Sequence, residues 1–189
     1  MGYVLASRSP RRAALLKMIG ITDFLVIPDE NSEEAAPGLS PPQTVCGIAQ
    51  QKAKNVSLFC GADDIIIAAD TLVYLDGRPL GKPDSPECAA AMLRELSGRR
   101  HSVYTGVALI GGAVCLTDAE MTDVYFRDIL DSEISAYVET GEPMDKAGAY
   151  GAQGRAAVFV ERIEGDFFNV MGLPLCRLSI MLRKLGIFV

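Results

Sequence analysis

Histidine and tryptophan are nearly absent from this sequence, which has one histidine, His101, and no tryptophan. His101 has no serine or cysteine partner in any triad-like motif, so we interpret it as a structural residue. The five cysteines are odd in number and form no Cys-x-x-Cys pair. This pattern argues against a disulfide framework and a zinc ribbon, and it favours reduced thiols packed as small hydrophobic residues.

Long apolar runs are also lacking. The apolar run 65–69 is far shorter than the roughly 20 residues that a membrane helix needs. Arginines at positions 8, 11 and 12 follow the first apolar residues rather than precede them, which does not fit a signal peptide. We therefore expect a cytoplasmic protein with no membrane partner.

Basic side chains are outnumbered by acidic ones, 18 to 24, which gives a net charge of −6 at pH 7. This balance disfavours a non-specific nucleic-acid binder, although basic groups that converge on one spot can still bind a polyanion. The chain of 189 residues is long enough to bury a sizeable core and shows no repeat, linker or low-complexity tract. We expect a single domain that spans residues 1–189.

Strand-like and helix-like segments alternate along the chain, which predicts an α/β fold. Ser9-Pro10 and Ser40-Pro41 indicate helix starts, because serine caps a helix and proline suits its first position. A hairpin turn is expected at Asp76-Gly77. The expected strands are 3–6, 24–28, 65–71, 101–110, 114–127 and 159–163. The expected helices are 10–19, 41–58, 86–96, 131–139 and 175–185.

Two arginines, Arg11 and Arg12, fall in the first turn of a predicted helix, where the helix dipole disfavours cations. With Ser7 and Ser9 beside them, the strand–turn–helix segment has the hydroxyls, backbone N–H groups and guanidinium groups of an anion site. Such a site would suit phosphate. The alternative is that both arginines simply point into water.

Two further charges interrupt apolar patterns. Lys52 lies on the apolar stripe that Val45, Ile48 and Val56 define, so it either snorkels to the rim or points into a polar cleft. Asp70 ends a strand that is apolar on both faces, and ligands in α/β sheets bind beyond the carboxyl ends of strands. A carboxylate there is a natural metal ligand or general base, and the alternative is a structural aspartate that caps a turn.

Two weaker signals lie further along the chain. Pro83 fixes the backbone after Lys82, so the lysine is presented in a defined direction. The segment 142–154, which includes Gln153, is dense in glycine, proline and polar residues and is longer than an ordinary turn. It fits a specificity or active-site loop and a plain surface loop equally well.

Together, these segments resemble the Maf family in order and spacing over essentially the whole chain. The longest matches are Leu5-Ala6-Ser7-Arg8-Ser9-Pro10-Arg11-Arg12 and Glu142-Pro143-Met144-Asp145-Lys146-Ala147-Gly148-Ala149-Tyr150-Gly151-Ala152-Gln153-Gly154. Shorter matches are Ala49-Gln50-Gln51-Lys52-Ala53, Ala69-Asp70-Thr71, Gly81-Lys82-Pro83, Leu96-Ser97-Gly98, His101-Ser102-Val103 and Val170-Met171-Gly172-Leu173-Pro174-Leu175. No single motif is specific, but jointly they are.

The resemblance implies a mixed, twisted α/β sheet with flanking helices and two lobes around a cleft, related to the inosine triphosphatase fold. It also implies hydrolysis of nucleoside triphosphates between the α- and β-phosphates with a divalent cation, Mg²⁺ or Mn²⁺. Asp70 matches the catalytic acceptor of the family, Lys52 and Lys82 match lysines of its cleft, and Glu33 matches an acidic loop residue. Glu33 and Asp70 are thereby the expected metal ligands, and Ser7, Arg11 and Arg12 the expected phosphate-binding residues.

One branch of the family prefers dTTP and UTP, and the other prefers 7-methyl-GTP. This chain is similar to the first branch at Arg11, Thr71 and Gln153. The chemistry agrees, because a glutamine amide offers both the donor and the acceptor that a neutral pyrimidine edge needs. A cationic 7-methylguanine would instead suit an aromatic face and a carboxylate.

Two other functions remain open at this point. One is a nucleotide-binding regulator of cell division or septum formation without physiological turnover, and the intact Asp70, Glu33, Lys52 and Lys82 argue against it. The other is a generic phosphatase or nucleic-acid-processing enzyme, whose nucleic-acid version the acidic net charge disfavours. The sequence leaves the oligomeric state undecided, with a homodimer as one option.

Overall fold

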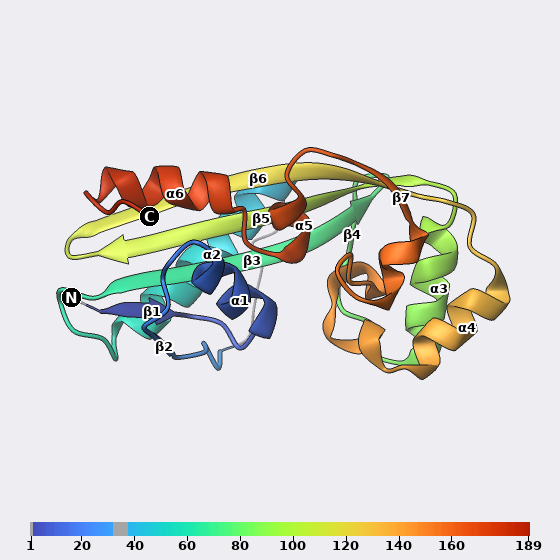
Figure 1. Ribbon diagram of the computed structural model, residues 1–189, viewed down its shortest axis with the longest axis horizontal. Coiled ribbons are helices and arrows are strands. Elements are labelled where there is room, and N and C mark those ends of the chain that lie inside the picture. Colours follow the sequence, from blue (N-terminus) through green and yellow to red (C-terminus); the bar gives the residue numbers. More distant parts are fainter. Residues whose placement is uncertain (1, 32–37) are drawn as a thin grey trace. The chain divides into compact units, whose positions relative to one another are not determined.

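The computed structural model describes residues 2–31 and 38–189 (Figure 1). The strands are β1 (Tyr3–Leu5), β2 (Phe24–Val26), β3 (Ile65–Leu75), β4 (Arg78–Leu80), β5 (Arg100–Gly111), β6 (Val114–Phe126) and β7 (Val160–Glu164). They form one sheet in the order β2-β1-β3-β5-β6-β7, with β4 paired to β3. Strand β1 is parallel to β2 and β3, whereas β4 and β7 are antiparallel to their partners. The predicted mixed α/β sheet is therefore confirmed.

The helices alternate with the strands, largely as the sequence predicts. They are α1 (Pro10–Met18), α2 (Pro41–Ser57), α3 (Pro86–Leu96), α4 (Asp131–Glu139), α5 (Phe167–Met171) and α6 (Leu175–Lys184), with short 3-10 turns at Glu142–Asp145, Ala147–Ala149 and Arg155–Phe159. Ser9 caps α1 as expected, since its Oγ accepts a hydrogen bond from the N–H of Arg12 at 3.4 Å. Within the described ranges, no helix combines the length and the apolar character that crossing a membrane requires.

The chain divides into two compact units. The first unit comprises Met1–Asp70, Thr105–Glu120 and Gly172–Val189, and the second comprises Thr71–Tyr104 and Met121–Met171. The long strands β3, β5 and β6 contribute residues to both units. The expectation of a single domain over residues 1–189 stays a prediction.

Small side chains bring α2 close to the sheet in the first unit. Ala49 and Ala53 of α2 are fully buried, and so is Ala108 of β5. A Cβ added at Gly106 of β5 would lie 2.3 Å from the backbone carbonyl carbon of Val45 in α2, so only glycine fits there. This close contact fixes the height of α2, and therefore of Lys52, above the sheet.

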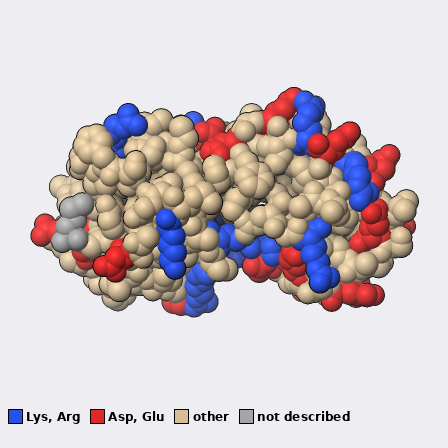
Figure 2. Space-filling view, viewed as in Figure 1, with Lys and Arg blue, Asp and Glu red and all other residues tan. Residues whose placement is uncertain are grey.

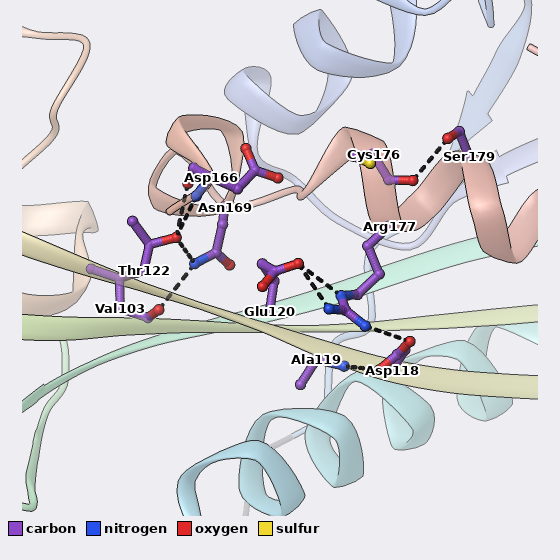
Figure 3. A network of polar contacts seen from close by, with 10 residues as sticks. All are labelled: Val103, Asp118, Ala119, Glu120, Thr122, Asp166, Asn169, Cys176, Arg177 and Ser179. Carbon is purple, nitrogen blue, oxygen red and sulfur yellow. Dashed lines mark hydrogen bonds and ion pairs between the residues drawn. The ribbon is translucent and has the colours of Figure 1, made fainter. Parts of the chain in front are cut away.

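An ion-pair cluster fastens α6 to β6 in the same unit. The Nε of Arg177 donates to Glu120 Oε2 at 2.9 Å, and its Nη1 donates to Asp118 Oδ2 at 2.7 Å (Figure 3). Burial works to lower the pKa of Arg177, but the two carboxylates outweigh it and raise that pKa. The guanidinium therefore stays charged, as a fork-shaped donor between two carboxylates should.

The second unit has its own core, in which α3 and α4 pack beside the sheet (Figure 1). Its fully buried members include Leu93, Leu96 and Ile134. Asn169 of α5 is also fully buried, and its Nδ2 donates to Val103 O at 3.0 Å and to Thr122 Oγ1 at 2.9 Å (Figure 3). These bonds attach α5 to β5 and β6, which explains a buried polar residue at this position.

The end of β3 differs from the sequence-based expectation. That expectation ends the strand at residue 71 with Asp70 at its carboxyl end, whereas β3 continues to Leu75. The extension forms because Val73 and Leu75 are buried and pair with Leu80 and Arg78 of β4. The turn between these strands, Asp76-Gly77, has positive φ at both residues (50° and 77°) and confirms the predicted hairpin.

Candidate active site

The expected site residues fall into two groups, one in each unit. Ser7, Arg11, Arg12, Lys52 and Asp70 belong to the first unit, and Thr71, Lys82 and Gln153 belong to the second. Glu33 lies outside the described residues.

The start of α1 gathers the predicted anion-binding groups. Ser7 Oγ accepts a hydrogen bond from Arg12 Nη1 at 3.1 Å and another from the N–H of Ser9 at 3.2 Å. The Nε of Arg12 donates to Gly172 O at 2.7 Å, which ties the turn before α1 to the turn before α6. Arg11 is half-buried and follows in the same helical turn. Hydroxyls, the guanidinium group of Arg12 and the N-terminal N–H groups of α1 therefore meet at one place, as a phosphate site requires.

A buried ion pair links α2 to β3. The Nζ of Lys52 lies 2.8 Å from Asp70 Oδ1, and the two residues are only 8% and 5% exposed. Lys52 therefore points inward, toward a charged partner, and the snorkelling alternative is wrong. The ammonium compensates a carboxylate whose isolated burial would be very unfavourable.

The second oxygen of Asp70 has a different environment. Oδ2 is buried and has no hydrogen-bond partner among the described residues. Buried carboxylate oxygens are normally satisfied, so an orphaned one indicates a place for a water, a cation or a substrate atom. This observation distinguishes Asp70 from an aspartate that caps a turn, because such an aspartate directs its oxygens at backbone N–H groups.

Asp29, which follows β2, is a further carboxylate that the sequence reasoning missed. Its Oδ2 accepts a hydrogen bond from Asn55 Nδ2 at 2.9 Å, and its Oδ1 accepts one from Asn31 Nδ2 at 2.6 Å. Burial works to raise the pKa of Asp29, but the two asparagines and the charge of Lys52 outweigh it and lower that pKa. Its position after a strand parallel to β1 is the signal that could have identified it.

The site candidates of the second unit are exposed or half-buried residues. Lys82 and Gln153 are exposed, and Thr71 is half-buried on β3. The N–H of Gly148 donates to Gly81 O at 3.0 Å, so the segment 142–154 is bonded to the residue that precedes Lys82. The segment is therefore an ordered part of the second unit that carries Gln153.

His101 has a structural place in the second unit, as predicted. It is 2% exposed, its Nε2 lies 2.8 Å from Tyr150 Oη, and its ring packs edge-on against Phe126 and Tyr150. Burial lowers the pKa of His101 to about 4. The imidazole is therefore neutral at physiological pH and is a packing element.

The sequence matches a family described as "Maf-like protein" over residues 2–185. Among curated proteins, the dTTP/UTP pyrophosphatase of Moorella thermoacetica is 49% identical over 189 residues, which cover 98% of this chain and 96% of the relative. Those of Caldicellulosiruptor saccharolyticus and Methanosarcina mazei are each 46% identical over 188 residues. These alignments cover 97% and 98% of this chain and 94% and 95% of the relatives.

Solved structures give a fold-level likeness. The Staphylococcus aureus Ham1 protein superimposes with a TM-score of 0.53 at 16% identity, over 97% of this chain and 99% of that one. A HAM1 protein from Coxiella burnetii gives 0.51 at 16% identity, with the same coverage. At this identity the likeness concerns the fold alone, and it agrees with the predicted architecture.

Proposed function

The chain belongs to the Maf family, and we propose on that basis that it hydrolyses dTTP and UTP to the nucleoside monophosphate and pyrophosphate. Full-length identity to dTTP/UTP pyrophosphatases supports the substrate class. The observation that carries the chemistry is the buried Lys52–Asp70 pair, whose Asp70 Oδ2 has no partner among the described residues.

The reaction needs a water to attack the α-phosphorus and the bond to the β-phosphate to break. We assign Asp70 as the group that accepts the proton of this water, through the orphaned Oδ2. Lys52 holds Oδ1 at 2.8 Å, which orients the carboxylate. As the new P–O bond forms, the electron pair of the bridging bond leaves with pyrophosphate.

Cations of the chain offset the charge of the substrate. A nucleoside triphosphate carries about four negative charges, which preorganised cations and N–H donors must stabilise as the reaction proceeds. Arg12, Ser7 and the N-terminus of α1 form one such cluster. Arg11 and Lys82 are proposed to contribute two further cations, one from each unit.

A divalent cation, Mg²⁺ or Mn²⁺, is proposed as the cofactor, with Asp70 and Glu33 as its protein ligands. Asp70 fits this role, because an unsatisfied buried carboxylate oxygen is the ligand type that hard cations prefer, whereas Glu33 lies outside the described residues. In the described ranges, no three His, Cys, Asp or Glu side chains gather into a cation site. The adjacent Lys52 also opposes a bare cation. The metal is therefore expected to bind together with the triphosphate, whose charge it would partly neutralise.

Three residues support the preference for pyrimidines. Gln153 can donate to a pyrimidine carbonyl and accept from the ring N–H, so a uracil or thymine edge is satisfied. Arg11 and Thr71 also match the dTTP- and UTP-preferring branch. A site built on such hydrogen bonds rejects a mismatched base strongly, because its own polar groups are then left unpaired.

The working environment is proposed to be the cytoplasm, without a nucleic-acid partner. All five cysteines are free, as expected in a reducing compartment. Lys, Arg, Asp and Glu side chains are interspersed over the face of the second unit that Figure 2 shows. Such a mixture of charges does not resemble a surface that binds a phosphate backbone.

A homodimer remains a proposal that size-exclusion chromatography with light scattering would test.

The deciding experiment is a pyrophosphate-release screen of the purified protein across nucleoside triphosphates, with Mg²⁺ and with Mn²⁺. We expect dTTP and UTP to give the highest kcat/KM, with one nucleoside monophosphate formed per pyrophosphate. Release of inorganic phosphate instead would indicate a generic phosphatase. Binding of nucleotide without any turnover would favour the regulatory alternative.

A further inference from the structure

The segment 142–154 is held in an unusual backbone conformation. Ala149 is fully buried and has a φ of 61°, which an L-residue adopts only at some cost. Gly148 has a φ of 67°, and a Cβ there would lie 3.0 Å from a side-chain methyl of Val73. Such conformations persist only where the surrounding structure fixes them, and they cluster at ligand-binding sites.

Glu142, the first residue of this segment, holds the carboxyl-terminal end of the segment in place. Its Oε1 accepts a hydrogen bond from Tyr137 Oη at 3.1 Å, and its Oε2 accepts one from the N–H of Arg155 at 3.1 Å. Tyr137 Oη in turn accepts a hydrogen bond from the N–H of Gly151 at 3.3 Å. The carboxylate of Glu142 thus anchors the backbone at Gly151, through the tyrosine, and at Arg155 directly. Gln153 lies between these two anchors.

The segment 142–154 packs tightly around the carboxylate of Glu142. A Cβ at Gly154 would lie 2.0 Å from Glu142 Oε1, so a larger residue there would displace the carboxylate. The Nζ of Lys146 donates to Glu142 O at 2.6 Å, and a Cβ at Gly151 would lie 2.7 Å from Lys146 Cε. Burial and then the neighbouring Glu142 carboxylate raise the pKa of Tyr137, so the phenol remains a hydrogen-bond donor.

This arrangement matters because the Gln153 side chain itself is exposed and rotatable. A glutamine amide presents a donor and an acceptor that exchange places when the amide rotates, so it can satisfy either a uracil or a cytosine edge. Discrimination between the two then depends on which atoms of the base edge the amide reaches, and the position of the Gln153 backbone sets that reach. Preorganisation of this kind is supplied by the residues behind the contacting one.

We propose that Glu142, with Tyr137, is a positioning residue that sets the selectivity of Gln153 for uracil and thymine over cytosine. The proposal deepens the proposed function and rests on it. Glu142 acts through the backbone of Gly151 and Arg155 and is not assigned any contact with the substrate.

The test compares Glu142→Gln, Tyr137→Phe and Glu133→Gln. Glutamine at position 142 has one acceptor oxygen for two donors, and phenylalanine at 137 removes the hydroxyl that links Glu142 to Gly151. Glu133 is the matched control, because it is also a half-buried carboxylate of the second unit that bonds to an N–H, at Leu130, and to a side chain, that of Arg127. None of its bonds reaches the segment 142–154.

Steady-state kcat and KM are measured for UTP and CTP with the metal-supplemented enzyme. For both test variants, we expect the ratio of kcat/KM for UTP to that for CTP to fall by about tenfold, mainly through a higher KM for UTP. The kcat at saturating UTP should change by less than about threefold, because the groups assigned to the chemistry are untouched. Glu133→Gln should leave the ratio unchanged even if it lowers the melting temperature.

A second measurement does not depend on turnover. Hydrogen exchange at the amides of Gly151 and Arg155 should accelerate in Glu142→Gln and not in Glu133→Gln, since these N–H groups lose their anchors. An unchanged UTP-to-CTP ratio in an active, folded Glu142→Gln variant would overturn the proposal, and so would equal losses on both substrates. If the wild-type enzyme itself showed no preference for UTP over CTP, the proposed substrate class would fail first.

Discussion

At the scale of single residues, the buried pair of Lys52 and Asp70 is the feature of the first unit to which we assign the chemistry. One oxygen of Asp70 is bonded to the lysine, and the other has no partner in the described part of the chain. Burying two charges is costly, and a hydrophobic pair of similar volume would often be as stable. The pair is therefore better explained by a reaction than by stability.

Asp70→Asn should abolish turnover while the protein stays folded. Asparagine keeps an Oδ1 that can accept from Lys52, but it cannot accept the proton of the attacking water. Loss of general-base action typically costs about 10²–10⁴-fold in rate, and a weaker metal site should add to this. The check is kcat together with a thermal melt. A variant that keeps more than about a tenth of the wild-type kcat would exclude the role assigned to Asp70.

Lys52→Met should lose activity and also stability, because the buried Asp70 carboxylate then lacks its ammonium partner. Breaking a buried pair from one side typically costs about 3–5 kcal/mol. The double variant Lys52→Met/Asp70→Asn should recover part of that loss, since the uncompensated charge is gone. Urea unfolding of the single and double variants measures this. Additive losses would show that the two side chains do not interact energetically.

At the scale of elements, the contact between α2 and β5 sets how far α2, which carries Lys52, lies from the sheet. Gly106 has no room for a Cβ, because the backbone of Val45 lies 2.3 Å from where that atom would be. Any larger residue must push α2, and with it Lys52, away from the sheet. A glycine in a strand is thus required by the approach of a helix.

Gly106→Ala should destabilise the protein by about 1–3 kcal/mol through overpacking, which corresponds to a fall in Tm of roughly 2–12 °C for a chain of this length. Activity should fall as well, because Lys52 moves with α2. Gly47→Ala is the control, since Gly47 lies in α2 with open space around its Cβ position. It should be neutral or slightly stabilising, because alanine is the better helix former. Equal melting temperatures for both variants would contradict the packing argument.

The aromatic cluster around His101, which lies on β5, should make the stability of the protein depend on pH. The pKa of His101 in the folded state is about 4, below the ordinary value of 6.5, so the unfolded chain binds a proton first as the pH falls. The stability that His101 contributes is complete above pH 6.5 and is lost between pH 6.5 and 4. The free energy of unfolding should fall by up to about 1.4 kcal/mol for each pH unit in this window, or roughly 3 kcal/mol in total.

Urea unfolding of the wild type and of His101→Gln from pH 7 to pH 4.5 checks this expectation. The variant should show a shallower pH dependence in that window, even if its stability at pH 7 is lower. Parallel curves for the two proteins would mean that His101 titrates alike in the folded and unfolded states.

At the scale of the whole molecule, the three residues that match the dTTP- and UTP-preferring branch are divided between the two units. Arg11 belongs to the first unit, whereas Thr71 and Gln153 belong to the second. A change in one of them should therefore alter the preference only in part. We propose that the three together favour a neutral pyrimidine.

Gln153→Glu should lower kcat/KM for dTTP, because a carboxylate repels the carbonyl oxygens of thymine. Adding Arg11→Trp and Thr71→Gln should raise kcat/KM for 7-methyl-GTP, since an aromatic face and a carboxylate suit its cationic base. A change in discrimination of a few kcal/mol corresponds to about 10²-fold between substrates. Competition assays with dTTP and 7-methyl-GTP provide the measurement. A wild-type enzyme that cleaved 7-methyl-GTP faster than UTP would refute the assignment.

The sequence by itself determined the fold class, the position of nearly every helix and strand, and most of the candidate site. These features follow from local rules: Ser-Pro helix starts, apolar periodicity and an Asp-Gly turn depend on neighbouring residues. The convergence of Ser7, Ser9 and Arg12 at the start of α1 was predictable for the same reason, since they lie within six residues of one another.

Only the tertiary structure decided which charges meet. Lys52 and Asp70 are 18 residues apart, and their pairing depends on how closely α2 approaches β3, which a residue as distant as Gly106 controls. The bond from Asn55 to Asp29 and the bond from Arg155 to Glu142 are likewise contacts between separate segments, and the burial of Asp70 Oδ2 also depends on how the elements pack. Sequence periodicity reports which face of an element is buried, but it carries no information on what lies opposite that face.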